Sequence, residues 1–152
     1  MVQAATPPNE FDLVLIECAV GITKPITETW FRVGGFADAG NFLNVMTRIV
    51  KGDGRIGSIR RVGDAILELM VGASDTSYTY LQTEGPMSPY FYHGCVALSS
   101  IGDAACRLTY TITYNQAAMY TDEQVVQRER ISKRFQAAVE AMKYTVESGT
   151  AD

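Results

Sequence analysis

Residues 106–146 read CRLTYTITYNQAAMYTDEQVVQRERISKRFQAAVEAMKYTV, and two different periods follow one another within this stretch. From Cys106 to Tyr114 polar and apolar side chains alternate, which is typical of a strand with one buried face. From Thr121 onward apolar side chains recur at helical spacing, which predicts an amphipathic helix of about 25 residues, close to 40 Å long. Because the apolar stripe of such a helix needs covering, we expect a sheet packed against it.

The predicted C-terminal helix has a start signal and two faces. Thr121 and Gln124 have the spacing of a capping box, which places the start of the helix next to Thr121. The apolar stripe predicted to face the sheet consists of Val125, Ile131, Phe135, Val139, Met142 and Val146. The charged residues predicted to face outward are Glu129, Arg130, Lys133, Arg134 and Lys143.

Strand-like segments fill the middle of the chain. The predicted strands cover residues 47–51, 57–62, 65–73, 77–83, 90–99 and 106–114. Turn-forming pairs such as Gly63-Asp64 and Gly102-Asp103 separate them. Connections this short leave no room for parallel crossovers, so we expect an antiparallel meander.

The N-terminal part completes the predicted architecture. Residues 1–10 are interpreted as a loose lead-in and residues 11–22 as a first strand. Pro25 can open a short helix that ends at Gly34-Gly35, and a second short helix is predicted over about residues 37–45. The predicted fold class is α+β: a seven-stranded curved antiparallel sheet, two short helices after the first strand, and a long C-terminal helix packed across the sheet, all in one domain over residues 11–148.

Strand alternation predicts which aromatic side chains face the interior. The tyrosines placed inward are Tyr78, Tyr80, Tyr92, Tyr110 and Tyr114. A sealed core seldom packs so many hydroxyl groups, because each needs a hydrogen-bond partner when buried. We therefore expect a cavity between the sheet and the helix, with apolar walls and a few polar groups, which is the usual form of a small-molecule site.

Two charged residues stand out within the predicted strands. Glu68 is the single charge in an otherwise apolar strand, and it is either outward and solvated or inward and functional. Outward placement would also bring Ile66 and Met70 to the wet face, so the two interpretations stay balanced. Arg60 and Arg61 are consecutive, so one of these two guanidinium groups must point into the interior.

Composition and motifs argue against several other classes. The 13 Lys and Arg are scattered in a chain of net charge −4, which does not favour a nucleic-acid partner. The glycine-rich segment 52–57 lacks the Gly-Lys-Ser/Thr ending of a phosphate loop, so it is interpreted as a tight strand connection at the cavity mouth. His93, the one histidine, is predicted to face outward, and no acidic or cysteine residue has suitable spacing to it. We expect neither a metal nor a cofactor.

The remaining features concern location and partners. Cys18, Cys95 and Cys106 are an odd number without a C-x-x-C pair, which fits buried thiols in a reducing compartment. The N-terminus lacks a secretory pattern, and no apolar run approaches the roughly 20 residues of a spanning helix. We expect a cytoplasmic protein without membrane insertion. An outward patch could support a homodimer, and its residues would be Leu67, Leu69, Phe91 and Ala97.

The order of elements resembles the START-like, or helix-grip (SRPBCC), superfamily, which includes birch-pollen-allergen-like proteins and bacterial polyketide cyclases. The resemblance runs from Phe11 to about Val146. It rests on Trp30 and Phe36, GDGRIGSIRRV (52–62), ELMVGASDTSYTY (68–80), YFYHG (90–94) and CRLTYTITY (106–114). It implies the predicted fold, with the C-terminal helix gripped over an internal cavity. Since the superfamily mixes enzymes with carriers and receptors, the fold alone leaves the function open.

Within that superfamily the chain is most similar to the lachrymatory-factor-synthase-like branch. The matching positions are Arg60 in Gly57-Ser58-Ile59-Arg60, Glu68 in Glu68-Leu69, and Tyr80 in Ser77-Tyr78-Thr79-Tyr80, with Tyr92 and Tyr110 as further cavity aromatics. In that branch the arginine and the glutamate form the catalytic polar pair. The segment between Arg60 and Glu68 is shorter than in the plant enzymes, which argues against the same substrate.

The expected function is a cofactor-independent lyase, isomerase or cyclase that acts on a small hydrophobic or aromatic substrate. Glu68 would be the general acid/base, Arg60 would anchor an anion of the substrate or hold Glu68 ionised, and Tyr80 would orient the substrate. The expected substrate-binding residues are Tyr92, Tyr110, Tyr78, Tyr114 and Phe135. The alternative is a non-catalytic carrier or sensor of a small hydrophobic ligand. A purely structural protein is a third class, and it would need the cavity filled by side chains.

Overall fold

The computed structural model describes residues 10–149. In chain order the elements are β1 (Leu13–Ile22), α1 (Ile26–Val33), α2 (Ala39–Leu43), β2 (Thr47–Lys51), β3 (Ile59–Val62), β4 (Ile66–Ser74), β5 (Ser77–Glu84), the 3₁₀ helix η1 (Ser88–Tyr90), β6 (His93–Ile101), β7 (Ala105–Asn115) and α3 (Thr121–Glu147). The lead-in expected over residues 1–10 lies outside the described residues, apart from Glu10.

The strands form one antiparallel sheet in the order β1-β7-β6-β5-β4-β3-β2. β7, the last strand in the chain, pairs with the first strand β1 along the whole length of β1, from Leu13 opposite Asn115 to Ile22 opposite Cys106. The strands β2 to β7 follow the chain as a meander, with tight turns after β3, β4 and β6 and longer connections after β2 and β5. Gly63 and Gly102 adopt positive φ angles of 61° and 67° in two of these turns, a conformation that favours glycine. The predicted seven-stranded α+β architecture is confirmed.

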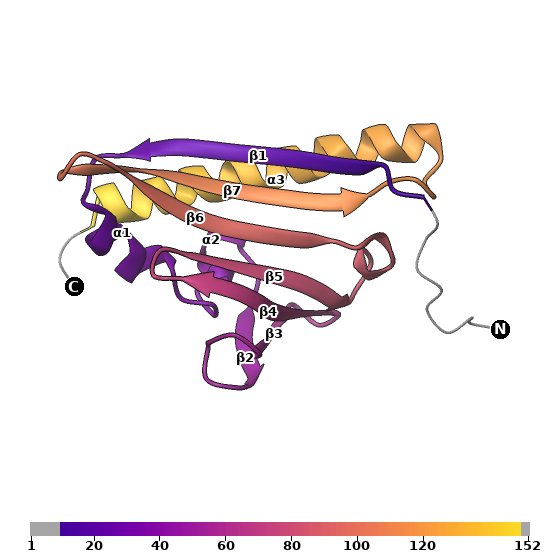
Figure 1. Cartoon of the computed structure of the whole chain (residues 1–152), viewed down its shortest axis with the longest axis horizontal. Helices are drawn as coiled ribbons and strands as arrows, with labels where there is room; N and C mark the ends of the chain where they lie inside the picture. The colour runs from indigo at the N-terminus through magenta and orange to yellow at the C-terminus, as the bar shows by residue number, and fades with distance from the viewer. Residues whose placement is uncertain (1–9, 150–152) are drawn as a thin grey trace.

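The long helix α3 lies alongside β1 and β7, and the sheet curves away from it through β6, β5 and β4 (Figure 1). The short helices α1 and α2 both contact α3. The core fills the space between the sheet and these helices. Its α3 residues are Ile131, Phe135, Ala138, Val139, Met142 and Val146.

The structure corrects the predicted start of α3. Thr121 is the first residue of the helix, Tyr120 is its N-cap, and no side chain caps the helix end. The Gln124 amide donates instead to the carbonyl oxygens of Gln116 and Met119, each at 3.2 Å, and so holds the loop before the helix. The capping-box prediction was wrong because Thr121 lies inside the helix and the Gln124 side chain binds the loop that precedes it.

The predicted stripe of α3 was wrong at Val125, which is 53% exposed. Val125 precedes Ile131 by six residues, which at about 100° per residue turns its side chain about 240° from that of Ile131. The buried stripe therefore begins at Ile131. The strand predicted over residues 90–99 also starts late, because η1 and the turn at Phe91, where φ is 56°, occupy its first residues.

The outward patch predicted as a dimer surface is only partly exposed. Phe91 is exposed and packs edge-on against Phe11 with ring centroids 6.1 Å apart, whereas Leu67, Leu69 and Ala97 are half-buried. Among the described residues no helix is both long and apolar enough to cross a membrane.

Candidate functional site

Arg60 and Glu68 are paired across the sheet and face its interior. They lie directly opposite one another on β3 and β4, and the alternation of both strands turns their side chains to the concave face. Arg60 is 1% exposed and Glu68 is 6% exposed. The sequence left open whether Glu68 points outward or inward. In the structure its carboxylate is buried, beside Met70 on the same face of β4.

Every nitrogen of the Arg60 guanidinium has a protein partner. Nε donates to Glu68 Oε1 at 2.9 Å, and Nη2 lies 2.9 Å from the same oxygen. Nη1 donates to the Phe36 carbonyl oxygen at 2.8 Å and, at 3.3 Å, to the Tyr78 hydroxyl. The guanidinium carbon also lies 4.3 Å from the centroid of the Phe36 ring and 4.4 Å from that of Tyr80. Arg60 is therefore a fixed, fully engaged cation behind Glu68.

Burial raises the pKa of Glu68 above its ordinary value, because the interior disfavours the ionised carboxylate. The charge of Arg60 and its hydrogen bond to Glu68 oppose this shift in pKa, as do the charge of Arg134 and the Gln82 amide. Gln82 lies opposite Glu68 on β5, and its own Oε1 accepts the backbone N–H of Met87 at 2.8 Å. Glu68 is thus a carboxyl group that Arg60 holds in place, and its proton affinity exceeds that of a surface glutamate.

Glu68 forms part of the wall of an open pocket of about 500 Å³. This volume lies within the roughly 300–1,000 Å³ of small-molecule sites. The sheet and the loops around η1 form one side of the pocket, and the first half of α3 forms the other. Its lining residues are Leu43, Val62, Ile66, Glu68, Tyr80, Gln82, Pro86, Met87, Tyr90, Tyr92, Glu123, Gln127, Arg130, Ile131, Arg134 and Phe135.

The structure divides the predicted site residues between this pocket and the core. Glu68, Tyr80, Tyr92 and Phe135 line the pocket. The other predicted residues do not line it and are fully buried, as Tyr80 also is: Arg60, Tyr78, Tyr110 and Tyr114. Much of the space that alternation assigned to a cavity is therefore packed core, and the open volume lies at one end of it.

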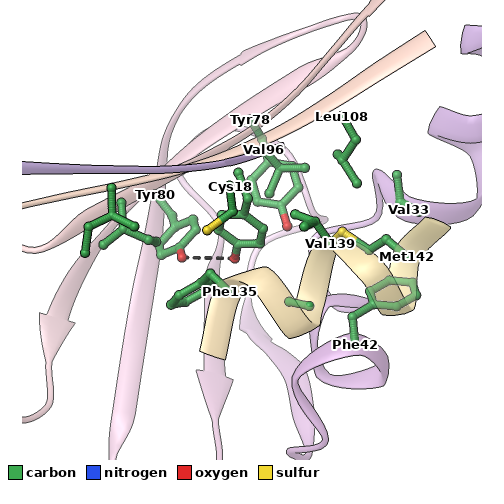
Figure 2. Close-up of a cluster of buried hydrophobic side chains, with 14 of the residues drawn as sticks. Cys18, Val33, Phe42, Tyr78, Tyr80, Val96, Leu108, Phe135, Val139 and Met142 are labelled. Atoms are coloured by element: carbon green, nitrogen blue, oxygen red, sulfur yellow. Dashed lines mark hydrogen bonds between the residues drawn. The ribbon is translucent and has the colours of Figure 1, made fainter. Parts of the chain in front are cut away.

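Only some of the buried tyrosine hydroxyls in that core are hydrogen-bonded. The Tyr80 and Tyr110 hydroxyls lie 3.1 Å apart and share a hydrogen bond, drawn as the dashed line at Tyr80 in Figure 2. Figure 2 also shows Phe135 of α3 beneath this pair, and its ring centroid lies 4.7 Å from that of Tyr110. The Tyr114 hydroxyl is buried without a hydrogen-bond partner among residues 10–149. Tyr78 bonds Arg60 and borders a separate pocket that contains Trp30 and Ile56.

Gly94 makes room for the Tyr80 ring. It lies opposite Tyr80 on β6, and a Cβ atom at this position would overlap the ring and its hydroxyl. The absence of a side chain at Gly94 therefore lets Tyr80 lie flat across the neighbouring strand, between the Arg60 guanidinium and the pocket.

Sequence reasoning missed the contribution of α3 to the pocket. Arg130 and Arg134 are exposed, as predicted, but they also line the pocket together with Glu123 and Gln127. The signal was present in the spacing: these four residues follow one another at helical intervals of three and four. They form a polar row next to the apolar stripe at Ile131, which places them at the edge of the covered face.

The glycine-rich segment 52–57 lies away from this pocket. Gly54, Arg55 and Ile56 border the separate pocket next to Tyr78. The loop's own contacts occupy several of its N–H groups: Gly54 N–H donates to Ser58 Oγ at 2.8 Å, and Gly57 N–H donates to the Met70 carbonyl oxygen at 2.9 Å. His93 is half-buried, and its Nδ1 lies 2.9 Å from the Phe91 carbonyl oxygen.

The fold has known relatives, although neither a family model nor a curated protein matches the sequence. A protein from Nitrosospira multiformis superposes with a TM-score of 0.74 at 19% identity, covering 89% of this chain and 97% of that one. Ara h 8.0201 gives a TM-score of 0.68 at 16% identity over 91% of this chain and all of its own. Norcoclaurine synthase from Thalictrum flavum, solved with dopamine and hydroxybenzaldehyde, gives 0.69 at 15% identity, covering 99% of this chain and 100% of that one.

These similarities, with the sheet order and the position of α3, define the structural class of the chain. It has the helix-grip fold that the sequence resemblance implied, with the long helix α3 packed against a seven-stranded antiparallel sheet.

Proposed function

We propose that the protein is a cofactor-independent lyase, isomerase or cyclase, and that a small hydrophobic or aromatic substrate binds in the pocket bordered by Glu68. The observation that carries this proposal is a buried carboxyl group with a raised pKa, held by an arginine, in the wall of an open pocket that also contains aliphatic and aromatic side chains. A raised pKa suits a group that takes up and releases a proton near neutral pH. Titratable groups with shifted pKa values in a pocket are typical of catalytic sites.

In this proposal Glu68 is the general acid/base and Arg60 positions it. Because each guanidinium nitrogen already has a protein partner, the geometry favours the role of Arg60 as a holder of Glu68 over that of a substrate anchor. Tyr80 and Tyr92 face the pocket, and their hydroxyls are suited to donate to negative charge that develops on the substrate. Tyr110 fixes the Tyr80 hydroxyl, and Phe135 supplies an apolar wall.

Norcoclaurine synthase offers limited support from the same fold. Its structure with dopamine and hydroxybenzaldehyde concerns small aromatic molecules, which fits the aromatic lining around Tyr80 and Tyr92. At 15% identity this similarity extends to the fold, so the substrate class follows from the lining of the pocket itself.

A carrier or sensor is the second candidate, and the contacts of Arg60 favour it. Arg60 and Glu68 form a satisfied ion pair, which a protein that only holds a ligand could use as a structural element. Both candidates require the same pocket and differ only in whether Glu68 moves a proton.

The experiment that separates them begins with native mass spectrometry of the purified protein, to identify the compound that occupies the pocket. Binding and turnover of that compound are then measured for the wild type, Glu68→Gln and Glu84→Gln. Glu84 is an exposed glutamate at the end of β5 and serves as the control. If Glu68 transfers a proton, Glu68→Gln lowers turnover by about 10²-fold or more while affinity changes by less than about tenfold.

Two results would contradict the enzymatic proposal. One is a Glu68→Gln variant that turns over at the wild-type rate. The other is a wild type that binds the compound without converting it, which would establish the carrier function.

A further inference from the structure

Two arginines stand at the mouth of the pocket, and the charge of one of them, Arg134, acts on the buried Glu68. Arg130 and Arg134 are one turn apart on α3, both are exposed, and both line the pocket. Among the ion pairs within residues 10–149 none includes either of them. Arg130 donates through Nε and Nη2 to Gln127 Oε1, at 3.0 and 2.6 Å, so its Nη1 is not used in these bonds. Arg134 makes no hydrogen bond within the described part of the chain.

The charge around this mouth differs from that of the whole molecule. The chain carries a net charge of −4, yet the charged groups lining the mouth are two arginines against the single carboxylate of Glu123. Deeper in the pocket Arg60 balances Glu68. Like charges four residues apart on a helix repel each other and lower its stability, so this pair is not explained by the stability of α3. A local positive mouth on an acidic protein attracts anions and repels cations.

The apolar part of the pocket lies next to this positive mouth. Ile131 and Phe135 each follow one of the arginines on α3, and Tyr80 and Tyr92 lie on the sheet side. Guanidinium groups match the planar, two-oxygen geometry of a carboxylate, which they bind through paired hydrogen bonds. A molecule that satisfies both parts has an apolar or aromatic body and one carboxylate at its end.

We infer that the ligand of this pocket is a small organic acid, whose carboxylate is held by Arg130 and Arg134 at the mouth while its apolar body extends inward toward Glu68. This inference rests on the proposed function for the pocket and adds the charge of the ligand. It assigns to two exposed residues of α3 the anchoring role for which Arg60 has no free nitrogen.

The test uses two probes of nearly equal shape, naphthaleneacetate and the uncharged naphthaleneacetamide, titrated into the full chain by calorimetry. The wild type is expected to bind the carboxylate about tenfold more tightly than the amide, as charge-assisted hydrogen bonds are stronger than neutral ones. The Arg130→Gln/Arg134→Gln double variant is expected to bind both probes equally, with the affinity for the amide unchanged. Arg128→Gln, an exposed arginine of α3 outside the pocket lining, is the control and keeps the tenfold preference.

The outcomes separate this inference from the proposed function. Equal binding of both probes by the wild type would overturn the anionic preference and leave the pocket as a ligand site. A preference that survives in the double variant, or is lost equally in Arg128→Gln, would overturn the assignment to Arg130 and Arg134. Failure of both probes to bind the wild type would overturn the pocket itself as a site for aromatic ligands of this size, and the inference with it.

Discussion

At the scale of single residues, the site depends on two buried charges that compensate each other. A carboxylate or a guanidinium removed from water loses several kcal/mol of hydration, which a close partner can offset. Arg60 and Glu68 supply this partner to one another across β3 and β4, and the Phe36 carbonyl oxygen satisfies a further nitrogen of Arg60. Removing either partner alone leaves an uncompensated charge in the interior.

We expect Arg60→Leu to lower the free energy of unfolding by about 3–5 kcal/mol, the typical cost of breaking a buried ion pair from one side. The Arg60→Leu/Glu68→Leu double variant should regain a large part of this loss, because no unpaired charge remains. Urea unfolding of the wild type, both single variants and the double variant measures this. Additive losses in the double variant would show that the two charges are not coupled.

Gly94 tests how closely the sheet fits the Tyr80 side chain. A Cβ atom at Gly94 would overlap the Tyr80 ring, so we expect Gly94→Ala to cost about 1–3 kcal/mol, typical of overpacking in a core. Gly21→Ala is the control, because a Cβ atom at Gly21 of β1 meets no atom within 4 Å. Thermal unfolding of both variants should show a loss for Gly94→Ala only. An equal effect of the two would mean that backbone preference, rather than Tyr80, accounts for the result.

At the scale of elements, periodicity predicted the strands and α3 but could not separate core from cavity. Alternation placed Tyr80, Tyr92 and Tyr110 on the concave face of the sheet, where the structure has them buried. The alternation of a strand does not tell how far along that strand the helix packs, and so it does not tell which inward side chains are covered. Tyr110 is covered by Phe135 of α3, whereas Tyr92 borders the open pocket. That distinction arises from tertiary packing between segments far apart in the sequence.

The same helix gives a matched comparison of a packed and an exposed position. Phe135→Ala removes a ring that is buried against Tyr110, and we expect a loss of about 3–5 kcal/mol in the free energy of unfolding. Val125→Ala alters an exposed side chain of α3, and we expect a change within about 0.5 kcal/mol. Denaturant unfolding at constant temperature measures both. A large loss for Val125→Ala would contradict the assignment of the buried stripe to the residues from Ile131 onward.

At the scale of the whole molecule, the sequence predicted the sheet, the two short helices and the gripping helix, while the location of the pocket required the three-dimensional structure. β4, β5, η1 and the first half of α3 meet around the pocket, and their lining residues extend along the chain from Ile66 to Phe135. Residue patterns identified Glu68 and Arg60 as unusual charges, and the family resemblance supported them. The sequence predicted an outward face for Arg130 and Arg134, because their place in the pocket that Glu68 also lines follows only from the packing of α3 against the sheet.

The central claim is that Glu68 moves a proton during turnover, and the pH dependence of turnover tests it most directly. Burial raises the pKa of Glu68. The part of the pH–turnover profile that reports the titration of Glu68, its limb, should therefore have a midpoint above the ordinary value of 4.5. If Glu68 first accepts a proton, only its ionised form is active, and activity rises with pH through this limb. If Glu68 first donates a proton, only its protonated form is active, and activity falls with pH. The measurement compares wild type and Glu68→Gln on the compound identified in the pocket. We predict that the limb is present in the wild type and absent from the residual activity of Glu68→Gln; an unchanged limb and rate in Glu68→Gln would contradict the claim.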